Sequence, residues 1–212
     1  MCYNRKRRLL GSAFLLLYDL TNGARRLSLL KKLCPRQIAA SLWSLDLEDL
    51  KGKGITAIIL DLDNTLLPWG SNDIPAETLR WVDKAKKLGF KLCITSNGLT
   101  GRVQQIAATL DVPAVCKAVK PRKKPFQKAL ELLETCPGET AVAGDQLFTD
   151  ILGGNRLSLY TILTNPLSDR ELSSTRLLRR VETYVMGRLL KKGCLTAGQF
   201  STRYSAGGRE RG

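Results

Sequence analysis

ITAIILDLDNTLLPW, residues 55–69, begins with a nearly continuous run of β-branched and aliphatic side chains and then reaches two aspartates, Asp61 and Asp63. A run of this kind suits a parallel strand that is covered on both faces. The pattern predicts a buried strand that delivers carboxylates to its carboxyl end. Taken alone, it fits an acidic turn that merely ends a strand equally well.

Strands and helices alternate along the chain on the carboxyl side of this run. The apolar patterns predict strands at residues 55–60, 90–95, 112–116, 140–143 and 160–164, and helices at 75–88, 100–110, 126–134 and 147–152. Such alternation indicates βαβ units and a parallel sheet. We therefore predict an α/β fold, a three-layer doubly wound parallel sheet with a five-stranded core. A chain of 212 residues is long enough for one such domain.

Polar side chains follow four of the predicted strands at the point where each strand ends. They are Asp61 and Asp63, then Ser96 and Asn97, then Lys120, and finally Asp145 with Asp150 five residues later. The carboxyl ends of parallel strands share one edge of the sheet, where ligands bind. Carboxylates suit Mg²⁺, and a hydroxyl and an ammonium can hold phosphate oxygens. The set predicts phosphoryl transfer.

The composition excludes several kinds of chemistry. The sequence has no histidine, so a Ser/His/Asp triad is excluded and acid/base work falls to carboxylates or lysine. Its six cysteines are scattered without a CxxC pair, which indicates neither a zinc cluster nor a disulfide framework. Free thiols are typical of a reducing compartment, so we expect a cytoplasmic protein.

The net charge of +15 lies mainly in the flanks, with +7 in residues 1–53, +2 in 54–165 and +6 in 166–212. We predict four segments: a basic, partly helical flank (1–50), the catalytic core (51–166), a basic amphipathic helix (167–192) and a disordered tail (193–212). Basic flanks suit an anionic partner, either phospholipid or nucleic acid. Two solvated helices without a partner are the alternative.

Both flanks leave alternatives open. The apolar run at residues 9–20 contains Asp19 and is too short to span a bilayer, and no cleavage site follows it. It predicts an interfacial or packing helix, or poorly ordered sequence. The amphipathic helix at 167–192 could attach reversibly to the inner face of a membrane, or its apolar stripe could pack on the sheet.

The motifs DLDNTLLPW, TSN, KP and GDQLFTD occur in order and resemble those of the haloacid dehalogenase (HAD) superfamily of phosphatases. Three stretches, LDNTLLPW, KPRKKPFQKAL and especially GDQLFTDILGGNRL, are similar to the YqeG-type branch of subfamily IIIA, which is related to phosphatidylglycerophosphate phosphatases. Asn64 stands where many relatives have glycine. The resemblance implies a Mg²⁺-dependent phosphatase that forms an aspartyl-phosphate.

The resemblance also implies a role for each site residue. Asp61 would be the nucleophile and Asp63 the acid/base, while Ser96, Asn97 and Lys120 would bind phosphate. The metal ligands would be the Asp61 and Asp145 carboxylates and the Asp63 main-chain carbonyl, with Asp150 as a secondary acidic partner. Alternatives remain: Thr95 could replace Ser96, any of four neighbouring basic residues could replace Lys120, and Thr149 and Asp150 could cap a helix.

Short intervals between the motifs leave no room for a large cap domain, so an open site for a large or surface-bound substrate is expected. We predict phosphatidylglycerophosphate as substrate, by family analogy. A soluble or nucleic-acid phosphate monoester is the alternative, although the flanks offer few of the aromatic residues that bind single strands. A non-catalytic binding protein is the third hypothesis. Trp69 could pack as core or lean over the site.

Overall fold

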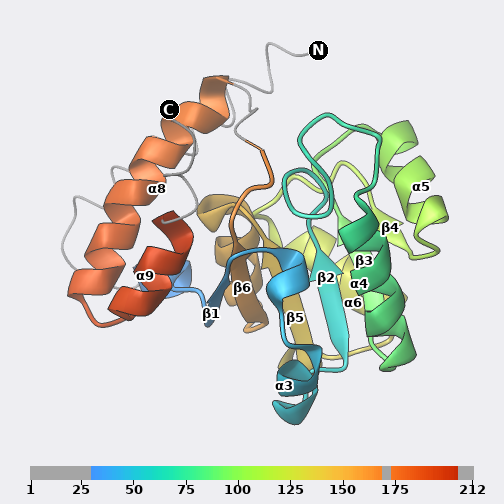
Figure 1. The fold of residues 1–212 in the computed structure, drawn as a ribbon, viewed down its shortest axis with the longest axis horizontal. Helices are drawn as coiled ribbons and strands as arrows, with labels where there is room; N and C mark the ends of the chain where they lie inside the picture. Colours follow the sequence, from blue (N-terminus) through green and yellow to red (C-terminus); the bar gives the residue numbers. More distant parts are fainter. Residues whose placement is uncertain (1–29, 169–172, 205–212) are drawn as a thin grey trace.

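The computed structural model describes residues 30–168 and 173–204. A six-stranded parallel sheet in the order β1-β6-β5-β2-β3-β4 forms its centre (Figure 1). β2, the first predicted strand, lies between β5 and β3. The doubly wound parallel fold is confirmed. The strands are β1 (Gln37–Ala39), β2 (Ala57–Leu60), β3 (Lys91–Thr95), β4 (Ala114–Val115), β5 (Thr140–Gly144) and β6 (Tyr160–Thr164).

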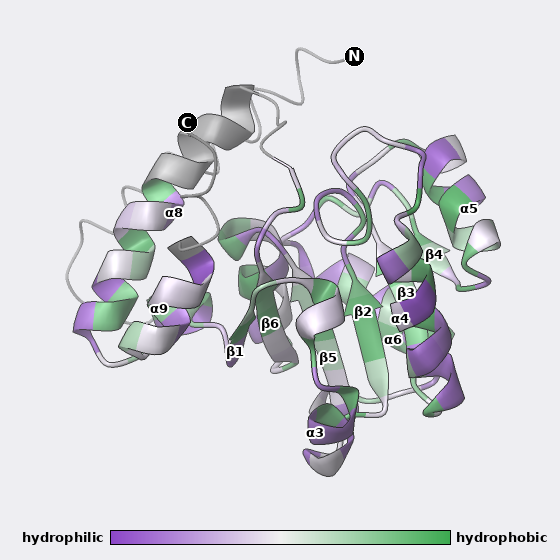
Figure 2. Ribbon diagram, viewed as in Figure 1, coloured by the Kyte–Doolittle hydropathy of each residue, from purple (hydrophilic) through white to green (hydrophobic). Residues whose placement is uncertain are grey.

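Alternate side chains of the central strand face two layers of helices, because successive residues of a strand point to opposite faces. Ile58 packs with α4 and α5 on one face, and Ile59 packs with α6 on the other. Figure 2 shows hydrophobic residues on the strands and hydrophilic ones on the outer surface of α4. The helical elements are η1 (Leu42–Ser44), α3 (Leu47–Gly52), α4 (Ala76–Lys87), α5 (Thr100–Thr109), α6 (Lys123–Leu133), η2 (Pro137–Glu139), the π-helical turn η3 (Leu147–Ile151), α7 (Leu152–Asn155), α8 (Ser173–Lys191) and α9 (Ala197–Tyr204).

The prediction of five strands is wrong by one, because β1 adds a sixth. Ile38 of β1 pairs with Leu163 of β6 in a parallel register. β1 is only three residues long and lies within leucines at helical spacing, so its own sequence carries no strand pattern. The boundary of the basic flank at residue 50 is therefore also wrong, since residues 37–39 belong to the sheet. The apolar run at residues 9–20 lies outside the described residues.

The prediction of disorder from residue 193 is wrong for α9. Leu195 and the partly buried Phe200 join the cluster that also holds Val185, Met186 and Leu189 of α8. That cluster continues into β6 and η3, so the packing alternative is confirmed for these three side chains of the amphipathic helix. The structure does not describe the side chains of the amphipathic helix before residue 181, so the basic residues predicted there lie outside the described part.

No inserted domain covers the carboxyl edge of the sheet within the described residues. Only a loop and α4 separate β2 from β3, and only α5 separates β3 from β4. The absence of a large cap domain is thereby confirmed. Among the helices that the structure describes, none combines the length and the apolar character needed to cross a membrane.

Candidate active site

Asp61 lies directly beyond β2 and is still held in the sheet. Its backbone N–H donates to the carbonyl of Ala143 in β5 at 2.9 Å, which extends the ladder by one residue. All four residues of β2 are buried, and Asp61 itself is 7% exposed. The strand therefore presents a carboxylate whose backbone position is fixed.

A buried ammonium lies between two carboxylates at this edge. Lys120 Nζ is 2.5 Å from Asp61 Oδ1 and 2.6 Å from Asp150 Oδ1. All three side chains are at least nine-tenths buried. Lys120 follows β4 and Asp150 lies in η3, so the structure brings together groups from three separate connections. Of the basic residues around position 120, Lys120 is the one that reaches Asp61.

Gly144 allows Asp150 to approach the end of β5. A Cβ atom at this position would lie 2.4 Å from Asp150 Cγ, much closer than real contacts allow. Asp150 Oδ2 also accepts hydrogen bonds from the backbone N–H of Gln146 and the hydroxyl of Thr149, at 3.3 and 3.2 Å. The N-cap of η3 is Gln146 and makes no capping hydrogen bond through its side chain, so Asp150 is not a helix cap but holds the backbone of the residue that precedes the turn.

The two central charges perturb each other. Burial raises the pKa of Asp61 well above its usual range, Lys120 opposes the rise, and Asp150 and Asp145 add to it. Burial lowers the pKa of Lys120, but the carboxylates of Asp150 and Asp61 outweigh burial and leave this pKa raised. The lysine therefore stays charged, while the Asp61 carboxylate needs further positive charge to stay ionised.

The donor set fits a hard divalent cation. Asp61, Asp145 and Asp150 each offer a carboxylate oxygen, and these atoms lie within 4.8 Å of one another. Three carboxylates and one ammonium leave a formal charge of −2, which one divalent ion balances. Mg²⁺ prefers such oxygen ligands. The structure thus places Asp150 in the cluster beside Asp61 and Asp145, and the role of the Asp63 carbonyl as a ligand stays a prediction.

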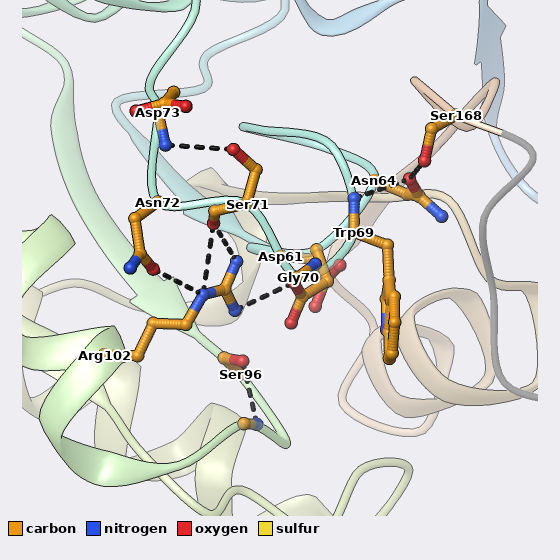
Figure 3. Close-up of polar contacts among 12 residues, drawn as sticks. Asp61, Asn64, Trp69, Gly70, Ser71, Asn72, Asp73, Ser96, Arg102 and Ser168 are labelled. Atoms are coloured by element: carbon orange, nitrogen blue, oxygen red, sulfur yellow. Dashed lines mark hydrogen bonds and ion pairs between the residues drawn. The ribbon is translucent and has the colours of Figure 1, made fainter.

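The side chain of Asp63 pairs with Arg102 and is not part of that cluster. Figure 3 shows Arg102 reaching toward Ser71 and Asn72. Arg102 Nη1 lies 2.8 Å from Asp63 Oδ1. Its other nitrogens donate to the carbonyl of Ser71 at 2.5 and 3.1 Å and to Asn72 Oδ1 at 3.1 Å. Sequence reasoning missed Arg102, although its place in the first turn of α5 puts it beside the carboxyl end of β3.

Ser96 and Asn97 follow β3 as predicted. The Ser96 hydroxyl accepts from the backbone N–H of Gly98 at 3.0 Å. Asn97 Oδ1 accepts from the backbone N–H of Lys120 at 2.9 Å, which fixes the loop that carries the lysine. Thr95, the alternative phosphate ligand, is buried at the end of β3. The phosphate-binding roles of these residues stay predictions.

Asn64 organises the loop after β2. Its φ of 65° is left-handed, a conformation that glycine adopts freely and in which asparagine is enriched among the other residues. Its Oδ1 accepts from the backbone N–H of Trp69 at 3.1 Å and from the hydroxyl of Ser168 at 2.8 Å. The residue therefore meets the backbone demand that glycine would meet. Trp69 itself is 40% exposed, so its packing as core is not what the structure shows.

A second residue that sequence reasoning missed is Arg203 of α9. Its Nη2 donates to the main-chain carbonyl of Asp145 at 2.8 Å and lies 2.9 Å from Glu182 Oε1 in α8. Its Nη1 donates to the carbonyl of Thr164. Nothing in the sequence indicates these contacts, because the partners lie far apart along the chain.

Comparison with known proteins gives consistent results. The family model described as mitochondrial PGP phosphatase matches residues 22–168. The chain is 36% identical over 159 residues to "Probable phosphatase YqeG" of Bacillus subtilis (strain 168), covering 75% of this chain and 92% of that one. It is 30% identical over 169 residues to "Phosphatidylglycerophosphate phosphatase 1, chloroplastic/mitochondrial" of Arabidopsis thaliana, covering 75% of this chain and 49% of that one.

Among solved structures, a HAD phosphatase from Thermococcus onnurineus superposes with a TM-score of 0.42 and 22% identity, over 51% of this chain and 58% of that one. This superposition is loose, so the assignment rests on the sequence matches. They make the protein a HAD-type phosphatase, as the motifs implied. Within that class, the chain belongs to the PGP phosphatase family.

Proposed function

We propose that the protein hydrolyses a phosphate monoester through an aspartyl-phosphate, and that its substrate is phosphatidylglycerophosphate, which it converts to phosphatidylglycerol. The observation that carries the proposal is the buried Asp61 beside the ammonium of Lys120, 2.5 Å away, at the open carboxyl edge of a parallel sheet. A nucleophilic carboxylate needs this kind of positive surrounding to remain ionised when buried.

In the first step, an Asp61 oxygen attacks phosphorus and the bond to the leaving-group oxygen breaks. Asp63 donates a proton to that oxygen, and Arg102 holds its carboxyl group in place. In the second step, Asp63 takes a proton from water, which attacks phosphorus and releases Asp61 and inorganic phosphate. Ser96 and Lys120 hold the phosphoryl oxygens through both steps.

Asp61 and Asp145 would hold Mg²⁺ with the Asp63 carbonyl, and Asp150 would support the site from beside Lys120. When bound, the ion supplies positive charge to the phosphoryl oxygens. Lys120 supplies the other positive charge from the protein itself. Removal of divalent metal with EDTA is expected to abolish phosphate release, and Mg²⁺ is expected to restore it.

The lipid substrate is supported by two independent points. One relative is named as a phosphatidylglycerophosphate phosphatase. The site also lacks a large cap domain among the described residues, which leaves space for a substrate that stays anchored in a membrane.

The decisive test measures phosphate release from phosphatidylglycerophosphate in mixed micelles and from soluble sugar, nucleotide and nucleic-acid monoesters, with Asp61→Asn as the inactive control. We expect the lipid to be preferred and the variant to be inactive on every substrate. Equal rates on lipid and soluble esters would reject the lipid substrate, and full activity of Asp61→Asn would reject the nucleophile.

A further inference from the structure

Three exposed apolar side chains lie in loops at the same sheet edge as the candidate active site. Among the residues that the structure describes, seven large apolar side chains are exposed. Trp69, Leu99 and Val119 are 40%, 71% and 50% exposed and lie in the loops after β2, β3 and β4. Single exposed apolar residues need no explanation. These three need one, because they lie in three loops at one edge of the sheet and each is close in sequence to a site residue. We name these three residues the apolar rim.

Two of the rim residues contradict local backbone preferences. Leu99 is the N-cap of α5 and makes no capping hydrogen bond, although serine, threonine, aspartate or asparagine stabilises this position. Val119 has a φ of 54°, a left-handed conformation that strongly disfavours a β-branched residue. Neither side chain is buried in the core. Residues that contradict the preferences of their local backbone and gain no packing in return are expected at functional sites.

Trp69 completes the rim. Its backbone is fixed by the hydrogen bond to Asn64, and its ring stands apart from the Arg102 contacts (Figure 3). Tryptophan is enriched where an apolar phase meets water, because its ring is largely apolar but carries one N–H donor.

Basic side chains border the rim on the same edge. They are exposed and lie between the end of β4 and the first turn of α6: Lys117, Arg122, Lys123 and Lys124. The first turn of α6 has no acidic residue, although the positive end of the helix dipole favours one. These charges are therefore also unfavourable for the helix itself and complement an external anionic surface. Asp73 and Glu77 are exposed near the same edge on the β2 side.

We infer that this edge docks on a bilayer of anionic phospholipid, with the apolar rim entering the headgroup region and the basic residues contacting lipid phosphates. That the docked lipid is also the substrate rests on the proposed function, whereas docking itself does not. This surface replaces the amphipathic helix as the membrane contact, because Val185, Met186 and Leu189 of that helix are buried.

The apolar part of the proposal is tested by co-sedimentation of the full chain with vesicles of phosphatidylglycerol and phosphatidylcholine, without substrate. The double variant Leu99→Ser, Val119→Asn is expected to bind about tenfold more weakly. Its melting temperature should be unchanged or higher, because both substitutions suit the local backbone. Leu132→Ser is the control, because this apolar side chain at the far end of α6 is 45% exposed, close to the value for Val119. Wild-type binding by the double variant would overturn the proposal.

The basic part is tested by Lys123→Gln with Lys124→Gln against the control pair Lys84→Gln with Lys128→Gln, which removes two exposed charges from helix surfaces beside the sheet. Lys123 and Lys124 are each expected to contribute roughly fivefold to vesicle partition, corresponding to about 1 kcal/mol for a basic residue near an anionic bilayer. The loss should vanish on pure phosphatidylcholine. Equal losses in the two pairs would mean that net charge, rather than this edge, attracts the protein.

Fluorescence locates the rim directly. In a Trp43→Phe background, vesicles should shift the emission of Trp69 to the blue, while the buried Trp81 contributes a constant signal. An unchanged spectrum on saturating vesicles would overturn the proposal.

Docking and catalysis can fail separately. The rim variants should hydrolyse soluble p-nitrophenyl phosphate at the wild-type rate and lose turnover only on vesicle-borne lipid. A wild-type protein that binds vesicles through the rim but releases no lipid phosphate would remove the proposed substrate and leave the docking surface. If the wild-type protein releases lipid phosphate while the rim variants bind vesicles normally, the docking surface is rejected and the proposed substrate is kept.

Discussion

Arg203 in α9 donates a hydrogen bond of 2.8 Å to the main-chain carbonyl of Asp145, although 58 positions separate the two residues in the chain. The same guanidinium forms a buried ion pair with Glu182. α9 lies outside the sheet, yet its Arg203 holds the backbone of Asp145, a predicted metal ligand. The contact suggests that the segment after residue 193 supports the site.

Arg203→Met is expected to reduce stability by about 3–5 kcal/mol, because it leaves the carboxylate of Glu182 buried without its cation. It should also raise the Mg²⁺ concentration that gives half-maximal activity, because the Asp145 carbonyl loses a donor. Urea unfolding and a Mg²⁺ titration of phosphate release measure the two effects.

The double variant Arg203→Met, Glu182→Leu separates these effects. Replacing both members of a buried ion pair by apolar residues is often neutral for stability, so most of the lost stability should return. The raised Mg²⁺ requirement should persist. A wild-type requirement in the double variant would show that Arg203 acts on stability alone.

Arg102→Gln tests whether this residue positions Asp63. General acid catalysis contributes roughly 10²–10⁴-fold when the leaving group is poor. We therefore expect the rate constant of the first step, in which the leaving group departs, to fall at least tenfold on glycerol phosphate-type esters and less than threefold on p-nitrophenyl phosphate, whose leaving group needs no proton. Single-turnover measurements of leaving-group release give this rate constant without the second step, which both substrates share.

Arg80→Gln is the matched control, because Arg80 pairs with Glu77 on the exposed surface of α4. It should change neither rate. A loss of equal size on both substrates in Arg102→Gln would indicate a general distortion of the site and not a defect in proton donation.

Much of this site could be predicted from sequence because its residues follow apolar strands directly. Asp61, Ser96 and Asp145 each come within one residue of a strand end, and parallel strands bring such ends to one edge. The α/β layering followed from the same alternation. These are local patterns, and the structure retains them.

The parts that were missed depend on contacts between distant segments. β1 is a strand only because β6 offers a free edge, and α9 is ordered by its packing against α8. Arg102 and Arg203 belong to no motif, and each acquires its partner through the fold. Tertiary contacts of this kind leave no periodic signal in the sequence.

Gly144→Ala should impair the site through steric contact. The added methyl group would overlap Asp150 and move it away from Lys120. We expect phosphate release to fall at least tenfold and stability to fall by about 1–3 kcal/mol. Gly138→Ala is the control, since nothing lies within 4 Å of a Cβ atom there. Similar losses in both variants would contradict the assigned role of Gly144.

The buried thiols should make stability fall at alkaline pH. Burial raises the pKa of Cys93 from 9.0 to about 12. The unfolded chain therefore loses this proton above pH 9.0, while the folded protein keeps it until about pH 12. Each pH unit in this window removes up to about 1.4 kcal/mol of stability. Unfolding curves between pH 9 and 11 measure the slope, which should be shallower in Cys93→Ala.

The same thiol should resist alkylation in the folded protein, because only the thiolate reacts. Iodoacetamide at pH 8 should modify the exposed Cys136 well before Cys93. Burial also raises the pKa of Cys34 to about 12, with a further contribution from Cys194, so Cys34 should react slowly as well. Mass spectrometry after timed quenching gives the order, and rapid labelling of Cys93 would contradict its burial.

The position of Arg203 near the end of the described chain affects when the site becomes complete during synthesis. A ribosome completes every strand of the sheet before it reaches residue 203. During synthesis, the connection after β5 therefore exists for a time without the donor that later holds the Asp145 carbonyl. Catalytic competence should thus mature last, after the sheet has formed, and arrive with the closing helix.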